Sequence, residues 1–152
     1  TVLLQTYKEM EILIIGNQLR RLKNMYGDSV NFHMEYVETE DETTEEEMVA
    51  LAVFRASGKY ICFLDDSLLF ADHVEVLVNE LAFSNKRICY TGRFQRKKEN
   101  GMHPPYPCFM FEKSIFDKYK SSYEMGGGLE GFTSYIYKRN LPGFIEKTTV
   151  IY

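Results

Sequence analysis

Gly58-Lys-Tyr-Ile-Cys-Phe-Leu-Asp-Asp-Ser67 is a short apolar run that ends in polar residues. The part from Tyr60 to Leu64 is almost unbroken, which is typical of a strand covered on both faces in a largely parallel sheet. We therefore expect a central strand of an α/β fold, in which helices flank a mostly parallel sheet.

Asp65 and Asp66 follow this strand directly, and Ser67 comes next. Open α/β sheets bind ligands in the crevice outside the carboxyl ends of their strands. Adjacent carboxylates repel each other unless a cation neutralises them, and their oxygens suit Mg²⁺ or Mn²⁺ that bridges to substrate phosphates. The pair therefore indicates a metal site. The alternative is that both acids only open a turn or cap a helix.

Length and composition predict one soluble domain over residues 1–152, because 45% hydrophobic residues are enough to fill a core. The formal net charge of -4 argues against a protein built to bind nucleic acid. No apolar run is long enough to cross a bilayer, and the start does not resemble a signal peptide. Cys62, Cys89 and Cys108 lie far apart and suggest neither a disulfide framework nor a zinc site, so we expect a reducing, cytoplasmic location.

Periodic patterns predict the other elements. Glu11 to Ile15 is a second buried strand, closed by the turn residues Gly16-Asn17. Thr44 and Glu47 form a capping box at the start of a helix, and Asp72 and Glu75 give a second capping signal. Helices are expected at 19–26, 44–57, 72–83, 114–119 and 130–140, and further strands at 30–37, 87–94, 108–111 and 144–152.

These motifs resemble the family 2 glycosyltransferases, which have the GT-A fold. Gly58–Ser67 is similar to the family's segment with the DXD-type motif, usually Gly-Glu-Tyr-Ile-x-Phe-Leu-Asp followed by further aspartates. Gln5-Thr6-Tyr7 resembles the Gln-Thr-Tyr that leads into the family's second strand. The resemblance spans roughly Leu3 to Pro142 and implies a single GT-A domain, a Rossmann-like domain of nucleotide-diphospho-sugar transferases.

The resemblance also implies an activity, the inverting transfer of a sugar from a nucleotide-diphosphate donor to an acceptor hydroxyl. Asp65 and Asp66 would hold Mg²⁺ or Mn²⁺ and contact the nucleotide, and Ser67 stands where the family's last metal-binding aspartate lies. Glu130 matches the family's base, which deprotonates the acceptor hydroxyl. The alternative for Glu130 is a plain acid at a helix N-terminus.

Several positions depart from the family pattern. Asn17 stands where aspartates hold the nucleotide base and ribose. The Asn17 amide can hydrogen-bond to a nucleotide base. Asparagine equally suits a turn or a helix cap, and we favour this second interpretation. Val49 and Ala50 replace an Arg-Asn pair that grips phosphate, and Gly131 replaces an aspartate beside Glu130. A second hypothesis is therefore a glycosyltransferase-like domain that has lost catalysis and serves in binding or assembly.

The family's inner first strand, which ends in Pro-Thr-Tyr-Asn, has no counterpart here. We expect that the chain is a fragment of a longer protein or that another segment occupies the slot. Unpaired backbone edges invite pairing with another chain, so we expect self-association unless the strand at 144–152 closes the gap.

Overall fold

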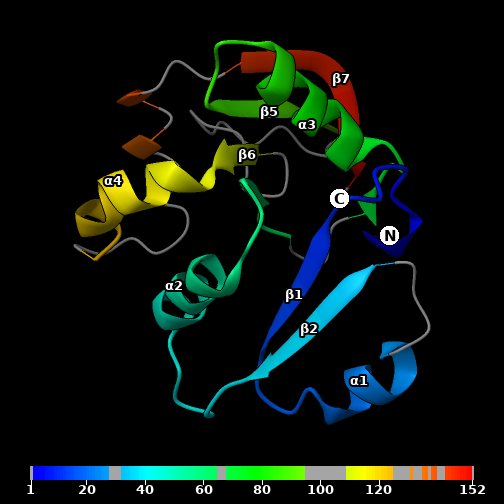
Figure 1. Ribbon diagram of the computed structural model, residues 1–152, viewed down its shortest axis with the longest axis vertical. Coiled ribbons are helices and arrows are strands. Elements are labelled where there is room, and N and C mark those ends of the chain that lie inside the picture. Colours follow the sequence, from blue (N-terminus) through cyan, green and yellow to red (C-terminus); the bar gives the residue numbers. More distant parts are fainter. Residues whose placement is uncertain are drawn as a thin grey trace.

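The computed structural model describes residues 2–27, 32–64, 68–94, 109–124, 131, 135–136, 138–139 and 143–151. Helices and strands follow one another in an α/β arrangement (Figure 1). In chain order they are η1 (Val2–Leu4), β1 (Glu11–Gly16), α1 (Arg20–Tyr26), β2 (His33–Glu38), α2 (Glu45–Arg55), β3 (Tyr60–Cys62), β4 (Leu68–Leu69), α3 (His73–Phe83), β5 (Ile88–Phe94), β6 (Phe109–Glu112), α4 (Lys113–Glu124) and β7 (Gly143–Ile151). None of the helices in the described ranges is both long enough and apolar enough to cross a bilayer.

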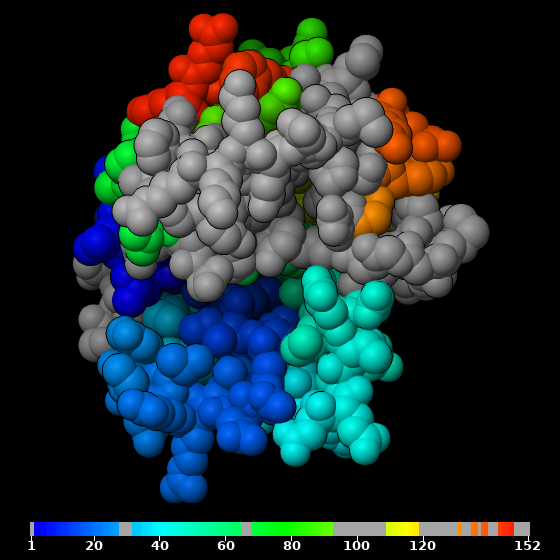
Figure 2. Space-filling model, turned by 180° about the vertical axis from the view of Figure 1, so that it is seen from behind, coloured from blue at the N-terminus to red at the C-terminus, as the bar shows by residue number. Residues whose placement is uncertain are grey.

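The strands form two separate sheets. β1 and β2 pair in parallel, from Glu11 opposite His33 to Gly16 opposite Glu38. The other strands pair in the order β3-β6-β5-β7-β4, with β5 and β7 parallel and the remaining neighbours antiparallel. In Figure 1, α1 and β2 lie at one end of the molecule and β7 lies at the other. Figure 2 views the molecule from behind and shows the same separation between blue and red segments.

Two expectations about the sheet are wrong. The strand arrangement is mixed and not mostly parallel, and β3 is the terminal strand of its sheet and not a central one. The prediction failed because the apolar run of Tyr60–Leu64 indicates only that both faces of the strand are covered. It carries no information on the direction of the neighbouring strand. β6 is equally apolar, yet it pairs antiparallel with both β3 and β5.

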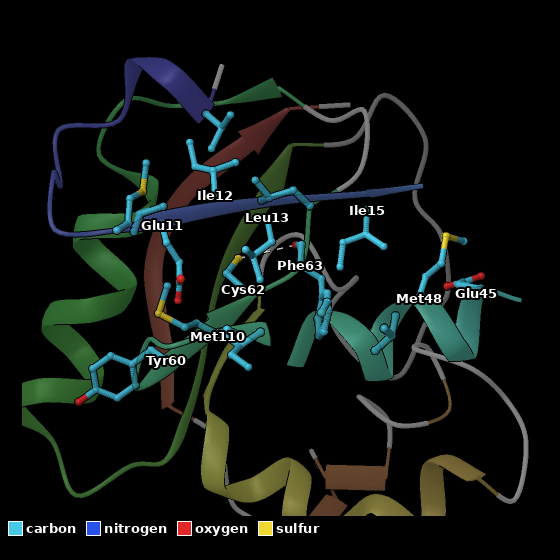
Figure 3. A pocket seen from close by; sticks show the side chains of 18 residues that line it. Glu11, Ile12, Leu13, Ile15, Glu45, Met48, Tyr60, Cys62, Phe63 and Met110 are labelled. Atoms are coloured by element: carbon cyan, nitrogen blue, oxygen red, sulfur yellow. Dashed lines mark hydrogen bonds between the residues drawn. The ribbon is translucent and has the colours of Figure 1, made fainter. Parts of the chain in front are cut away.

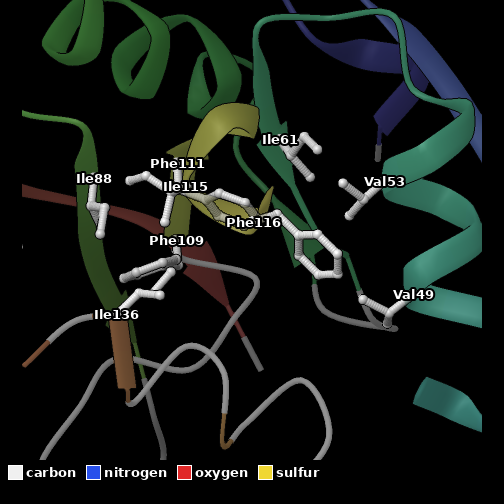
Figure 4. Packing of buried hydrophobic residues seen from close by; sticks show 9 residues of the cluster. All are labelled: Val49, Val53, Ile61, Ile88, Phe109, Phe111, Ile115, Phe116 and Ile136. Carbon is white, nitrogen blue, oxygen red and sulfur yellow. The ribbon is translucent and has the colours of Figure 1, made fainter. Parts of the chain in front are cut away.

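The hydrophobic core lies on both faces of the five-stranded sheet. Side chains alternate along β6, so that Phe109 and Phe111 face α2 and α4 while Met110 faces α3. The first cluster, drawn in Figure 4, consists of Val49, Val53, Ile61, Ile88, Phe109, Phe111, Ile115, Phe116 and Ile136. The second consists of Val74, Leu77, Leu81, Cys89 and Met110. Helices therefore cover both faces, as expected for an α/β fold.

Two helix ends follow the local sequence signals. At the start of α2 the Glu47 amide donates to Thr44 Oγ1 at 3.2 Å and the Thr44 amide donates to Glu47 Oε2 at 2.9 Å, which confirms the capping box. The bonds that the Thr44 amide and hydroxyl donate to the Glu47 carboxylate hold the pKa of Glu47 below its usual value. α1 ends at Tyr26, and a Cβ atom on its C-cap residue Gly27 would come within 2.5 Å of the Lys23 carbonyl oxygen. Only glycine fits that close approach.

Candidate functional site

The expected metal site follows β3 in the chain. Asp65–Ser67 lies outside the described residues, and so does Glu130, so their predicted roles stay predictions. Leu64 and Leu68, the described residues on either side of Asp65–Ser67, are 41% and 55% exposed. The chain therefore reaches the surface directly before and after the acid pair.

Gln5 connects the amino-terminal segment to the start of α3. Its side chain is fully buried. Nε2 donates to the Phe70 carbonyl at 2.9 Å, and Oε1 accepts from the Val74 amide at 3.0 Å. Val74 lies in the first turn of α3, where amides have no partner within the helix. Gln5 therefore caps α3 although it lies 69 residues earlier in the sequence.

Thr6 reinforces this connection, and the local acids do not act as the caps we expected. The Thr6 amide donates to the Ala71 carbonyl at 2.7 Å, and its hydroxyl donates to the Glu75 carboxylate. Asp72 is the N-cap residue but makes no side-chain capping bond, and it forms an ion pair with Lys147 instead. The predicted capping role of Asp72 and Glu75 is thus wrong, because partners from distant segments bind both carboxylates.

His73 brings α3 against the end of β3. It is fully buried, and its Nε2 lies 3.9 Å from Sγ of Cys62. His73 is not among the predicted site residues, although its position in the sequence carries a signal. His73, Leu77 and Leu81 recur at a spacing of four, which places them on one face of a helix, and that face packs inward. The contact brings together Cys62 and His73, which flank the acid pair in the sequence.

Asn17 is the predicted nucleotide-binding residue that the structure does describe. Its Nδ2 donates to Oδ1 of Asp41 at 3.0 Å, so it joins the loops after β1 and β2. The contact places Asn17 in a loop, and its predicted role toward a nucleotide stays a prediction. The next residue, Gln18, has a φ of 53°, a left-handed conformation that is uncommon outside glycine. These loops lie at the carboxyl ends of two parallel strands, which is the ligand-binding edge of an α/β sheet.

A groove of about 480 Å³ separates β1 from β3 (Figure 3). Its walls are β1, α2 and β3, and most of the side chains that line it are apolar. In Figure 3, Leu13 and Ile15 lie on one side of β1 and Ile12 lies on the other. Both faces of β1 therefore contribute to the lining, so the groove follows the edge of the strand.

Glu11 links the two sheets at this groove. Its Oε1 accepts hydrogen bonds from the Ser57 amide at 2.6 Å, the Ser57 hydroxyl at 3.0 Å and the Gly58 amide at 2.7 Å. Burial acts to raise the pKa of Glu11, but the bonds from Gly58 and Ser57 outweigh it and hold the pKa below its usual value. An ionised carboxylate on β1 thus holds the turn that leads into β3.

Cys62 and Cys89 are free thiols. Cys89 is buried beside α3, where its Sγ donates to the Leu77 carbonyl at 3.4 Å. Burial raises the pKa of the Cys89 thiol, and the nearby Cys62 and Glu80 raise it further. Cys89 therefore stays protonated and serves packing, because a thiol needs its thiolate form to act as a nucleophile.

The comparisons with known proteins identify the type of fold. No family model matches the sequence, and no curated protein matches it. The structure is similar to the crystal structure of S. aureus TarS, with a TM-score of 0.68 and 14% sequence identity. The match covers 99% of this chain and 32% of the TarS chain, so this chain spans about a third of the length of TarS. TarS is a glycosyltransferase, and this chain shares the α/β fold of the part of TarS that it matches.

Proposed function

We propose that this protein is a glycosyltransferase that moves a sugar from a nucleotide-diphosphate donor to the hydroxyl group of an acceptor, such as a glycan. The observation that carries the proposal is the fold similarity to TarS over nearly the whole chain. The acid pair directly after β3 supports it, because adjacent carboxylates suit a cation that bridges to substrate phosphates. We assign the domain to the GT-A type on the same residues that resemble the family 2 enzymes.

The donor set after β3 fits a divalent cation. Asp65, Asp66 and Ser67 offer carboxylate and hydroxyl oxygens, which are the hard ligands that Mg²⁺ and Mn²⁺ prefer. When bound, such an ion would neutralise charge on the leaving diphosphate. Since Ser67 supplies no charge, we expect the two carboxylates to hold the ion firmly only together with the donor's phosphates.

The remaining roles belong to Asn17 and Glu130. Asn17 would hydrogen-bond to the nucleotide base from the carboxyl end of β1, in exchange for its bond to Asp41. Glu130 would take the proton of the acceptor hydroxyl from within about 2.6 to 3.2 Å. A direct displacement of this kind inverts the anomeric carbon. The free thiols of Cys62 and Cys89 suit a reducing compartment, so we place the reaction in the cytoplasm.

One observation favours a second function, a domain that binds or assembles but does not catalyse. Val49 stands where the resembling family carries a phosphate-gripping residue, and its side chain is buried in the core against α4. Val49 also lines the groove between β1 and β3, but as valine it offers no charge to a ligand. Under this alternative the domain binds a nucleotide or a glycan without turnover.

Calorimetry with Mn²⁺ and a nucleoside diphosphate distinguishes both functions from a domain that binds neither ligand. We expect each ligand to bind about tenfold more tightly in the presence of the other, because the phosphates complete the ion's ligand shell. The Asp65→Asn/Asp66→Asn double variant should lose this coupling. Asp117→Asn, on the exposed surface of α4, is the matched control and should keep it.

Turnover of nucleotide sugars then distinguishes the enzyme from the binding domain. Glu130→Gln should leave the calorimetric signal intact and lower turnover by about 10²- to 10⁴-fold, the usual contribution of a general base. Coupled binding without turnover in the native chain would favour the second function. Equal heats for the native chain and the double variant would refute the metal site and with it the proposed mechanism.

A further inference from the structure

Three large apolar side chains are exposed in the segment that contains the acid pair. Leu64 is 41% exposed, Leu68 is 55% exposed and Phe70 is 45% exposed. Single exposed apolar residues need no explanation, but several of them together commonly mark an interaction site. Leu64 directly precedes Asp65, and Phe70 follows Asp66 by four residues. The exposed apolar residues thus flank the predicted metal site on both sides in the sequence.

Leu68 and Phe70 lie on the same face of the chain at β4. Side chains alternate along a strand, and Leu69 between them is only 9% exposed and belongs to the core. β4 is the terminal strand of its sheet and pairs with β7, so the expectation that 144–152 closes the gap of the first strand is wrong. Leu68 and Phe70 together form an exposed apolar patch, here called the β4 patch.

The backbone under Phe70 is held in place by several hydrogen bonds. The Phe70 carbonyl accepts from Gln5 Nε2 at 2.9 Å and from the His73 amide at 3.1 Å. The next carbonyl, of Ala71, accepts from the Thr6 amide at 2.7 Å. An aromatic side chain on a fixed backbone loses little conformational freedom when a ligand binds to it. Phe70 is therefore well suited to act as a rigid binding platform.

Size and charge select the class of ligand for the β4 patch. A stable protein complex buries about 800 Å² on each partner, whereas one whole aromatic side chain covers about 150–250 Å². Asp65 and Asp66 in the same segment would repel an anionic membrane surface. A sugar ring is small and uncharged, and the hydrogens of its C–H face carry the partial positive charge that the face of an aromatic ring attracts. The patch therefore suits a sugar ring.

We propose that Phe70 is the platform on which a sugar ring of the acceptor stacks, with Leu68 beside it. This role depends on the proposed transferase function, and it makes the acceptor a glycan and not a lipid or a protein. Four residues of extended chain span at most about 14 Å, so a ring on Phe70 lies within reach of a donor held at Asp66. Because the C–H face is common to most sugar rings, we expect the platform to accept several kinds of glycan with weak affinity.

A fluorescence titration tests this role without metal, nucleotide or turnover. The chain contains no tryptophan, so Phe70→Trp places a single fluorescent reporter on the platform. Phe83→Trp is the matched control, because Phe83 is 88% exposed at the far end of α3. Maltotetraose, cellotetraose and chitotetraose should shift the emission of the Phe70→Trp variant to shorter wavelength, since a stacked sugar excludes water from the indole ring. The emission of the control should stay unchanged.

Saturation-transfer NMR with the native chain gives an independent measurement, and it decides the question if the Phe70→Trp variant does not fold. The same oligosaccharides should bind the native chain. Phe70→Ala should weaken their binding by about threefold to tenfold, the usual effect of losing one aromatic contact. Phe83→Ala should leave the binding unchanged.

Unchanged emission with all three oligosaccharides, or equal shifts in the Phe70→Trp and Phe83→Trp variants, would overturn the proposal. A response to phosphatidylcholine vesicles alone would assign the β4 patch to lipid, and a response to a nucleotide sugar alone would assign it to the donor. Either result removes Phe70 from acceptor binding. If sugars bind at Phe70 but Mn²⁺ and nucleoside diphosphate show no coupling, the transferase function fails while the glycan platform stands.

Discussion

Replacing Gln5 with alanine should destabilise the fold, although Gln5 lies in an irregular segment near the amino end. The buried side chain makes two hydrogen bonds, to the Phe70 carbonyl and from the Val74 amide. Alanine supplies neither partner, so a donor in the first turn of α3 and an acceptor in the preceding loop lose their bonds. Water cannot replace them without opening the contact between the amino-terminal segment and α3.

The size of the effect follows from these two contacts. A buried polar group left without its partner costs about 1–3 kcal/mol, so the two groups together should cost about 3 kcal/mol. For a chain of this length each kcal/mol lowers the melting temperature by about 2–4 °C, so Gln5→Ala should melt roughly 6–12 °C below the native chain. This is a large loss for one side chain, since most single substitutions cost about 1 kcal/mol.

Thermal and urea unfolding followed by circular dichroism would measure the change, with Glu42→Ala as the control. Glu42 is exposed in the loop before α2, and alanine there should change stability by less than about 0.5 kcal/mol. Hydrogen exchange should locate the defect in the first turn of α3. If the two variants unfold together, the bonds of Gln5 do not support α3, and the reasoning about the distant cap is wrong.

Two further substitutions test the other polar contacts. Glu11→Gln should lower the free energy of unfolding at pH 7 by about 1–2 kcal/mol, because the ionised acceptor of the Ser57 and Gly58 amides is lost while partial exposure limits the effect. Since folding lowers the pKa of Glu11, this difference should hold above about pH 4.3 and shrink as the pH falls below it; a difference that grows with acid would contradict the contact. Thr44→Ala should lower the melting temperature by about 2–4 °C through loss of the helix cap, while Thr43→Ala, which lacks a capping role, should not.

Local sequence signals predicted the elements well and their pairing poorly. The capping box at Thr44 and the apolar spacing along α3 depend on residues within one helix, and the structure confirms both helices. The direction and position of β3 depend on β6, which lies about 50 residues later, and no local pattern contains that information. The cap that Gln5 provides was not predicted for the same reason, because its partner Val74 lies 69 residues later in the sequence.

The candidate site was predicted only in part. The family resemblance singled out Asp65, Asp66, Ser67 and Glu130 from motif and order, and these residues lie outside the described ranges. The α/β class agrees with the resemblance, while the GT-A type stays a proposal. Two residues that position the segment around the acids, Gln5 and His73, became visible only through contacts between distant parts of the chain.

The cap that Gln5 places on α3 also has a kinetic consequence. During synthesis Gln5 leaves the ribosome long before α3 exists, so its side chain has no partner until 69 further residues have been made. Closing a loop of that length carries an entropic cost before the bond forms, and such long-range contacts slow folding. The first turn of α3 is therefore completed late, when a segment made 69 residues earlier returns to it.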